Sequence, residues 1–212
     1  MTNIGAGVQE PMEMREPPAP RALAHIVADP APLGLAAFAM TTFALSISNT
    51  NVWGAASNTA IALALVYGGA AQLLAGMWEF VRKNTFGALA FTSYGAFWLS
   101  YVVLAKVILP TVKATQVPVV VGVFLLCWTI FTFYMLIGST GVNVALVAVF
   151  LVLEITFVLL TIGAFNSNAT LTKAAGWTGV ITAALAWYAS SAGLLNETLK
   201  RTLLPTWPLA KH

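Results

Sequence analysis

Six long apolar segments follow one another along the chain, separated by short stretches rich in proline, glycine and asparagine. The segments span residues 33–48, 59–80, 88–109, 117–137, 142–165 and 174–195. About 20 helical residues cross a bilayer, and the alternating pattern of a barrel strand is absent. Because backbone groups that face lipid must be hydrogen-bonded within their own segment, helices are required. The pattern predicts an all-α membrane protein with a six transmembrane helix bundle.

The composition indicates the same class of protein. Hydrophobic residues make up 59% of the chain and charged residues 8%, with a mean hydropathy of +0.84. A soluble domain would be about a quarter charged. Because the spans take up most of the chain, little is left for a domain outside the bilayer. We expect a multi-pass protein of the cell (plasma or inner) membrane.

The basic residues predict how the bundle is oriented, because cytoplasmic connections carry an excess of Lys and Arg. With the N-terminus inside, seven basic residues are cytoplasmic and three are outside. Both termini are therefore predicted cytoplasmic, with a flexible proline-rich tail (1–28), a membrane domain (29–197) and a second tail (198–212). The inside set is Arg15, Arg21, Arg82, Lys83, Lys200, Arg201 and Lys211, and the outside set is Lys106, Lys113 and Lys173.

The spans lack the side chains that an intramembrane enzyme would need. Both histidines, His25 and His212, lie in the tails, and the spans contain no Asp, no pair of Cys and no Ser beside a base. Covalent, acid–base and metal chemistry depend on such groups. Cys127 is the single cysteine, so no intramolecular disulfide can form. We expect no enzyme, no cofactor or metal, and no nucleic-acid partner.

Uncharged hydrogen-bonding groups gather near mid-membrane instead. Each threonine taken singly is explained by a bond to a carbonyl of its own helix. Their grouping over several helices favours a narrow polar path through the bundle. The groups are Thr41, Thr42, Gln72, Ser93, Tyr94, Ser100, Thr129 and Thr132.

The second span combines small residues with one amide. Ala64, Gly68, Gln72 and Gly76 fall four apart, a spacing at which small side chains let helices pack closely. Gln72 interrupts this stripe, and its amide requires partners in the bundle or in a water-lined passage.

Two glutamates lie in or beside the spans. Glu79 precedes Arg82 by three residues and Lys83 by four, which predicts an ordinary surface ion pair. Glu154 lies near the middle of the fifth span, where an ionised acid costs roughly 2.5–3.5 kcal/mol on insertion scales. Desolvation favours the protonated form there, which makes Glu154 a candidate for proton coupling. The alternative is a neutral acid hydrogen-bonded to a neighbouring helix.

Several motifs occur in a characteristic order and spacing. ADPAPLGLAAFAMTT begins at Ala28 and is followed by YGGAAQLLAG, NTFGALAFTSYGAFW, AAGWTG and LLNE before RTLLP. Across residues 29–205 the chain resembles the acetate uptake transporter family, which includes bacterial succinate-acetate permeases and fungal acetate transporters. The family signature at the first motif reads Asn-Pro-Ala-Pro-Leu-Gly-Leu.

The resemblance implies a six-helix protomer, usually a homo-hexamer, with a path in each protomer for acetate and, in some members, succinate or other short carboxylates. Family members are described as proton-coupled symporters or as anion channels. The resemblance also implies a hydrophobic constriction formed by Phe38, Tyr94 and Leu153. Ala186 is implied to affect substrate range.

Two positions depart from the family pattern. Asp29 replaces the signature Asn, and its negative charge would disfavour an entering anion, so it is a candidate for selectivity. Glu154 has no counterpart in the pattern. Since adjacent helix residues point about 100° apart, we expect Glu154 beside the constriction that Leu153 faces, and not in it.

Two other functions also fit the residues. A channel for small neutral solutes such as urea or ammonia is allowed, because no Lys or Arg lies at mid-membrane to hold an anion. A nontransporting membrane scaffold is suggested by the stripe of small residues in the second span.

Overall fold

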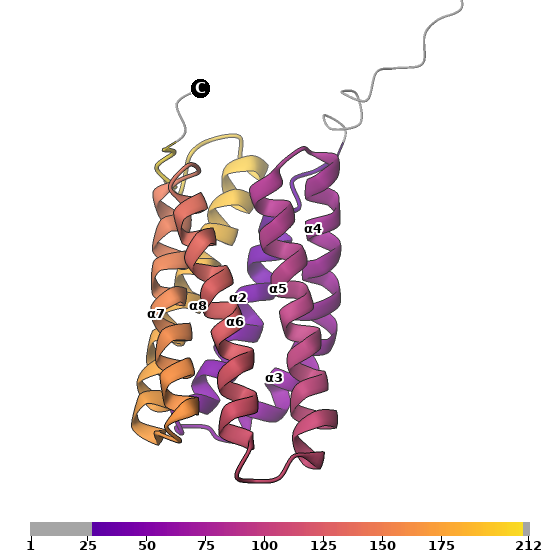
Figure 1. Cartoon of the computed structure of the whole chain (residues 1–212). Coiled ribbons are helices and arrows are strands. Elements are labelled where there is room, and N and C mark those ends of the chain that lie inside the picture. Colours follow the sequence, from indigo (N-terminus) through magenta and orange to yellow (C-terminus); the bar gives the residue numbers. More distant parts are fainter. Residues whose placement is uncertain (1–26, 210–212) are drawn as a thin grey trace, which may run out of the picture.

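A computed structural model describes residues 27–209, which form a bundle of long helices (Figure 1). Within this range six helical spans are long and apolar enough to cross a membrane, which confirms the predicted fold class. Both ends of the described chain lie at one end of the bundle, here called the terminal end, and the opposite end is the far end. The predicted N-terminal tail lies almost wholly outside the described residues. The spans are α2 (Ala31–Asn49), α3 to α4 (Ala56–Leu65 and Gln72–Val81), α5 (Thr85–Val103, continuing to Thr111), α6 (Val117–Ser139), α7 (Val144–Phe165) and α8 (Ala169–Thr198).

Two spans contain π-helical segments that the hydrophobic pattern did not predict. Val66–Ala71 joins α3 to α4, and Leu104–Ile108 extends α5 before a short 3₁₀ turn. Gly68 lies in the first of these segments, and a Cβ added there would overlap the side chain of Thr41 in α2. The small residues therefore allow this wider turn to pack tightly against its neighbours, as the packing interpretation of the stripe predicted.

The helices α2 and α8 pack closely along their lengths, and α8 continues the row through α7 to α6. At the far end, a Cβ added to Gly176 of α8 would lie 2.9 Å from the carbonyl carbon of Asn49. At the terminal end, the Ser190 hydroxyl donates to the Pro32 carbonyl at 2.7 Å. The helices α5 and α6, by contrast, have few close backbone approaches and meet mainly through aromatic rings.

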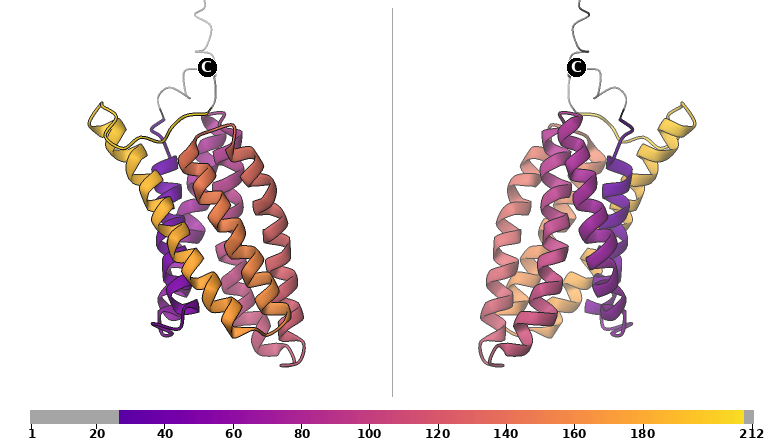
Figure 2. Two further views of the ribbon diagram at one scale, coloured as in Figure 1. Left: turned by 90° about the vertical axis from the view of Figure 1, so that its left-hand side faces the viewer. Right: turned by 90° about the vertical axis from the view of Figure 1, so that its right-hand side faces the viewer.

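The chain after α8 turns back toward the bundle. Figure 2 shows the last turns of α8 leaning away from the other helices and the segment 199–209 returning to them. In this return segment the carbonyls of Trp207 and Thr206 accept hydrogen bonds from the N–H groups of Val144 and Ala145, at 3.0 and 3.3 Å. These are among the first N–H groups of α7, which have no partner within their own helix. The return segment therefore completes the start of α7.

Candidate solute path

Two cavities enter the bundle from its opposite ends. The terminal vestibule has a volume of about 370 Å³ and is lined by side chains from α2, α4, α5, α7 and α8. The far vestibule has a volume of about 810 Å³ and is lined from α2, α5, α6, α7 and α8. The two cavities share no lining residue. A septum of protein therefore separates them.

The septum is thin, because three helices line both vestibules within a few turns. On α2 and on α7, the innermost lining residues of the two vestibules are seven positions apart. At 1.5 Å of rise per residue, this corresponds to about 10 Å along the helix. On α5 the separation is only three positions. The pairs, terminal vestibule first, are Phe38 and Leu45, Leu153 and Leu160, and Tyr94 and Phe97.

Phe38, Tyr94 and Leu153, the three residues expected at a constriction, lie together at the inner end of the terminal vestibule. All three are buried in one cluster, with exposed fractions of 5%, 2% and 4%. The ring centroids of Phe38 and Tyr94 are 5.5 Å apart. On the far side of the septum, Phe97 packs edge-on against Phe157 at 5.6 Å. The innermost side chains that bound the septum on its two sides are thus all apolar or aromatic.

The phenol of Tyr94 brings a polar group to the septum. Its oxygen lies 2.9 Å from the hydroxyl of Thr132 in α6, and either group can be the donor. Thr132 has no exposed surface, so this hydrogen bond is shielded from water. The bond fixes the Tyr94 ring between α5 and α6. Thr132 belonged to the group of mid-membrane hydroxyls, but nothing in the sequence predicted its pairing with Tyr94.

The four residues proposed for a polar path occupy different environments. Gln72 lines the terminal vestibule, and its Oε1 has no hydrogen-bond partner among the described residues. Thr41 donates to the Ala37 carbonyl at 2.9 Å, which is the ordinary behaviour of a threonine within a helix. Thr42 and Ser93 line neither vestibule. The structure therefore places only Gln72 at a cavity wall.

The two residues proposed for selectivity lie at different depths. Asp29 lines the terminal vestibule at its mouth, and its Oδ1 accepts the N–H of Ala31 at 3.0 Å. Asp29 precedes the N-cap Pro30, and its side chain supplies a partner for the N–H of the first residue of α2, as either Asp or Asn could. Ala186 of α8 is completely buried in the cluster that contains Phe38, Tyr94 and Leu153, but it lines neither vestibule.

The expected surface ion pair of Glu79 was wrong. Glu79 has no exposed surface, and its Oε2 accepts a hydrogen bond from Nδ2 of Asn84 at 3.0 Å. An ion pair at this spacing requires a helix that continues to Lys83, but α4 ends at Val81 and Lys83 has a φ of 61°. This left-handed residue turns the chain, so that Arg82 lies 3.9 Å from Asp29 instead.

Asn84 and Arg82 also line the terminal vestibule, which the sequence did not predict for either residue. Asn84 carried a recognisable signal, since an asparagine just before a helical run is a typical N-cap. Its Oδ1 accepts the N–H of Gly87 at 3.1 Å. Arg82 was predicted to mark the cytoplasmic side and to pair with Glu79, and neither prediction placed it at a cavity.

Glu154 is half-buried and lines neither vestibule. Its Oε2 is buried and has no hydrogen-bond partner among the described residues. Thr161, two helical turns further on the same face, lies 2.9 Å from the Thr129 hydroxyl of α6. Glu154 therefore lies on the face of α7 that also carries Thr161, outside both vestibules.

Six membrane-spanning helices that enclose two vestibules and a thin apolar septum define a multi-pass membrane transport protein. The sequence model of the GPR1/FUN34/yaaH family matches residues 13–211. The chain belongs to this family.

Some of the proteins similar to this chain are named as transport proteins. The "Succinate-acetate/proton symporter SatP" of Escherichia coli K12 is 41% identical over 181 residues, which cover 84% of this chain and 95% of the relative. "Ammonia transport outward protein 2" of Saccharomyces cerevisiae is 39% identical over 182 residues, covering 82% of this chain and 64% of the relative. The solved structure of the bacterial acetate channel SatP matches with a TM-score of 0.80 and 39% identity, covering 85% of this chain and 99% of that chain. These similarities support the expectation that the chain is not an enzyme.

Proposed function

We propose that this protein carries acetate and other short carboxylates, such as succinate, across the membrane through a path in each protomer. The observation that supports this proposal is the septum, where Phe38, Tyr94 and Leu153 close the gap between two vestibules. An apolar neck strips water from a solute, which penalises ions more than neutral acids. It can also gate by dewetting. The similarity to SatP supports acetate as the solute.

In the proposed mechanism, acetate or acetic acid enters a hydrated vestibule and loses water at the septum. Gln72 offers its amide at the wall of the terminal vestibule, where its Oε1 is unpartnered among the described residues. Tyr94, fixed by Thr132, keeps the aromatic wall in place at the crossing point. Thr41 and Thr42 contribute only if the helices move, because in this structure they line neither cavity.

Glu154 is the proposed site of proton coupling if the transporter is a symporter. A buried carboxylate oxygen without a hydrogen-bond partner is unfavourable when ionised, and a bound proton removes that penalty. Glu154 directly follows Leu153, so a change in the charge of Glu154 would change the electrostatic potential at the septum. Without coupling through this residue, the same path would work as a channel.

We further propose a homo-hexamer with both termini in the cytoplasm. The family resemblance supports the hexamer, and the excess of basic residues at the terminal end supports the orientation. Large apolar side chains are exposed around the outside of the bundle, as contact with lipid or with neighbouring protomers requires. Mass measurement of the purified protein in nanodiscs would give the number of protomers.

Flux of radiolabelled acetate and urea into proteoliposomes tests the proposal, measured with and without an imposed pH gradient. We expect acetate uptake well above that of protein-free liposomes and little urea uptake. A dependence on the gradient indicates proton coupling, and its absence indicates a channel. Urea uptake without acetate uptake would contradict the proposal.

Ammonia transport is the second candidate. Among the residues that the structure describes, no Lys or Arg borders the septum, so no fixed positive charge favours an anion there, and the similar yeast protein is named for ammonia transport. An internal pH dye distinguishes the two solutes, because entering ammonia raises the internal pH whereas entering acetic acid lowers it. If neither solute is transported, the nontransporting membrane scaffold is the hypothesis that still stands.

A further inference from the structure

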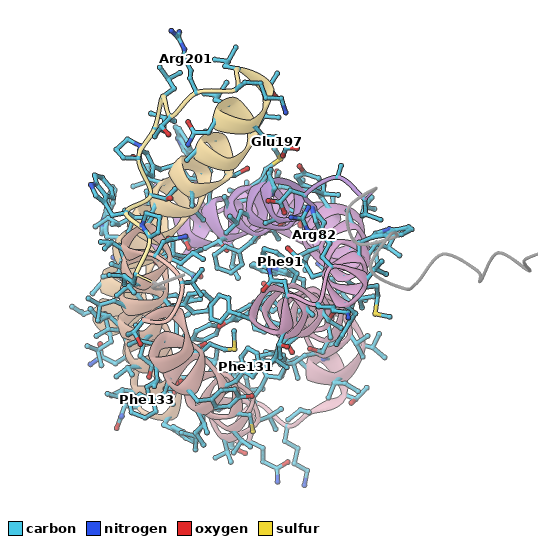
Figure 3. The ribbon with its side chains drawn as sticks, turned by 90° about the horizontal axis from the view of Figure 1, so that it is seen from above. Arg82, Phe91, Phe131, Phe133, Glu197 and Arg201 are labelled. Atoms are coloured by element: carbon cyan, nitrogen blue, oxygen red, sulfur yellow. The ribbon has the colours of Figure 1, made fainter. Side chains whose placement is uncertain are left out.

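Two opposite charges face each other at the mouth of the terminal vestibule. Asp29 lies just before α2 and Arg82 just after α4, and both line the cavity. Nη1 of Arg82 is 3.9 Å from Oδ1 of Asp29, and each side chain is about a third exposed, at 32% and 35%. Figure 3 looks down on this end and shows Arg82 at the inner edge of the ring of helices near Phe91, whereas Arg201 lies outside the ring.

The chemistry of this pair is that of a bound carboxylate. From its Cβ outward, the Asp29 side chain is an acetate group joined to the backbone. A guanidinium binds carboxylates through several N–H donors, and it does so whether the carboxylate is free or tethered. Asp29 is held in place, because its Oδ1 also accepts the Ala31 N–H at 3.0 Å. Its effective concentration at Arg82 is therefore high.

We propose that Arg82 captures solute carboxylates at the terminal vestibule and that Asp29 is a tethered competitor for it. This inference rests on the proposed transport of short carboxylates. A solute that approaches from the terminal end must displace Asp29 before it can pair with Arg82. Glu79, the buried acid at this end, lines neither vestibule, and its Oε2 accepts a hydrogen bond from Asn84, so it is not a second competitor.

The far vestibule has no such competitor. Lys173 is its one charged lining residue among the described residues, and no Asp or Glu lines it. A carboxylate that enters from the far end therefore meets the unpaired charge of Lys173, whereas at the terminal end the charge of Arg82 is already paired with Asp29. The path should bind its solute more weakly from the terminal end than from the far end.

The variant Asp29→Asn tests this inference without disturbing the fold, because asparagine keeps a side-chain oxygen that can accept the Ala31 N–H. Acetate uptake is measured in right-side-out and inside-out membrane vesicles over a range of concentrations. We expect Asp29→Asn to lower the KM for acetate in only one of the two vesicle orientations. The expected decrease is about two- to fivefold, which corresponds to the free energy of an exposed ion pair. Arg82→Gln should raise the KM in that same orientation.

The double variant decides whether Asp29 acts through Arg82. In the Arg82→Gln background, Asp29→Asn should leave the KM unchanged. If it lowers the KM by the same factor as in the wild type, Asp29 simply repels anions, and the competitor inference is wrong. An equal fall in both vesicle orientations would also refute it.

Lys83→Asn is the matched control. Lys83 adjoins Arg82, is exposed and does not line the vestibule, and asparagine tolerates its left-handed backbone. The KM of the Lys83→Asn variant for acetate should equal that of the wild type. If the wild type takes up no acetate in either orientation, the proposed function fails, and this inference fails with it. If the wild type transports acetate and Asp29→Asn does not differ from it, only the inference fails.

Discussion

The two vestibules are built by largely the same helices, yet they differ in size and in charge. The far vestibule is about twice as large, at about 810 against 370 Å³, and its charged lining residue is Lys173. The terminal vestibule holds an acid and a base that face each other, and the return segment contributes Thr206 to its wall. A path can therefore have unequal ends although one short septum separates them. Part of the asymmetry comes from segments at the helix ends, which carry Asp29, Arg82 and Thr206, and part comes from the helices, because α6 lines only the far vestibule and Lys173 lies within α8.

Opening the septum should have the largest effect, because it joins the two vestibules. Phe38→Ala removes a ring that packs 5.5 Å from Tyr94. We expect the flux ratio of lactate to acetate in proteoliposomes to rise on the order of tenfold to a hundredfold, as when a pocket gains room for extra atoms. Phe43→Ala is the control, since Phe43 lies on the same helix but lines neither vestibule. An unchanged ratio in a normally folded Phe38→Ala protein would remove Phe38 from the constriction.

The two ends can also be compared through their asparagine caps. Asn84 caps α5 at the terminal end and holds Glu79, whereas Asn168 caps α8 at the far end through the N–H groups of Thr170 and Leu171. Losing a cap costs about 1 kcal/mol. Asn84→Ala should cost roughly 1–3 kcal/mol more than Asn168→Ala, because it also leaves the buried Glu79 without a partner. Thermal unfolding in detergent measures this difference, and equal losses would show that the bond to Glu79 adds nothing.

If a proton moves together with the solute from one vestibule to the other, Glu154 is the residue proposed to carry it. In the wild type we expect a pH gradient to increase acetate uptake about severalfold. Glu154→Gln should abolish this increase, because glutamine cannot exchange a proton. Uptake without a gradient should persist. Glu197→Gln, at the exposed end of α8, serves as the charge control. If both variants respond to the gradient as the wild type does, Glu154 is not the coupling site.

Removing the charge of the far vestibule should have the smallest effect. Lys173→Gln should raise the KM for acetate about twofold, because attraction by one exposed charge is weak and screened by salt. The rise should appear only in the vesicle orientation that Asp29→Asn leaves unaffected. Lys113→Gln, which removes an exposed far-end charge that does not line the cavity, should have no effect. A KM that does not respond to Lys173→Gln would show that the far vestibule does not select by charge.

Hydropathy was sufficient to predict the spans, because desolvation dominates every other contribution in a bilayer. The predicted fifth span, 142–165, nearly coincides with α7 (Val144–Phe165). The π-helical segment Val66–Ala71 was missed, because it depends on how the backbone hydrogen-bonds and not on composition. The return segment was expected to be a tail, and its pairing with α7 joins residues about 60 positions apart, which no local pattern records.

The site was predicted less completely than the fold. Phe38, Tyr94 and Leu153 were assigned to a constriction by resemblance, and the structure brings them together, although their role in transport stays a prediction. Gln72 was identified by its polarity in an apolar span. The pairing of Asp29 with Arg82 could not be foreseen, because it joins two helix ends 53 residues apart and depends on where α4 stops.

The return segment also bears on how the protein is made. The N–H groups at the start of α7 receive their partners from Thr206 and Trp207, which the ribosome adds only after all six spans have been synthesised. Until then the N–H groups of Val144 and Ala145 at the start of α7 lack these two carbonyl partners. The terminal mouth of the path is therefore among the last parts of the molecule to assemble, and a stop codon shortly before Thr206 would leave all six spans intact but that mouth incomplete.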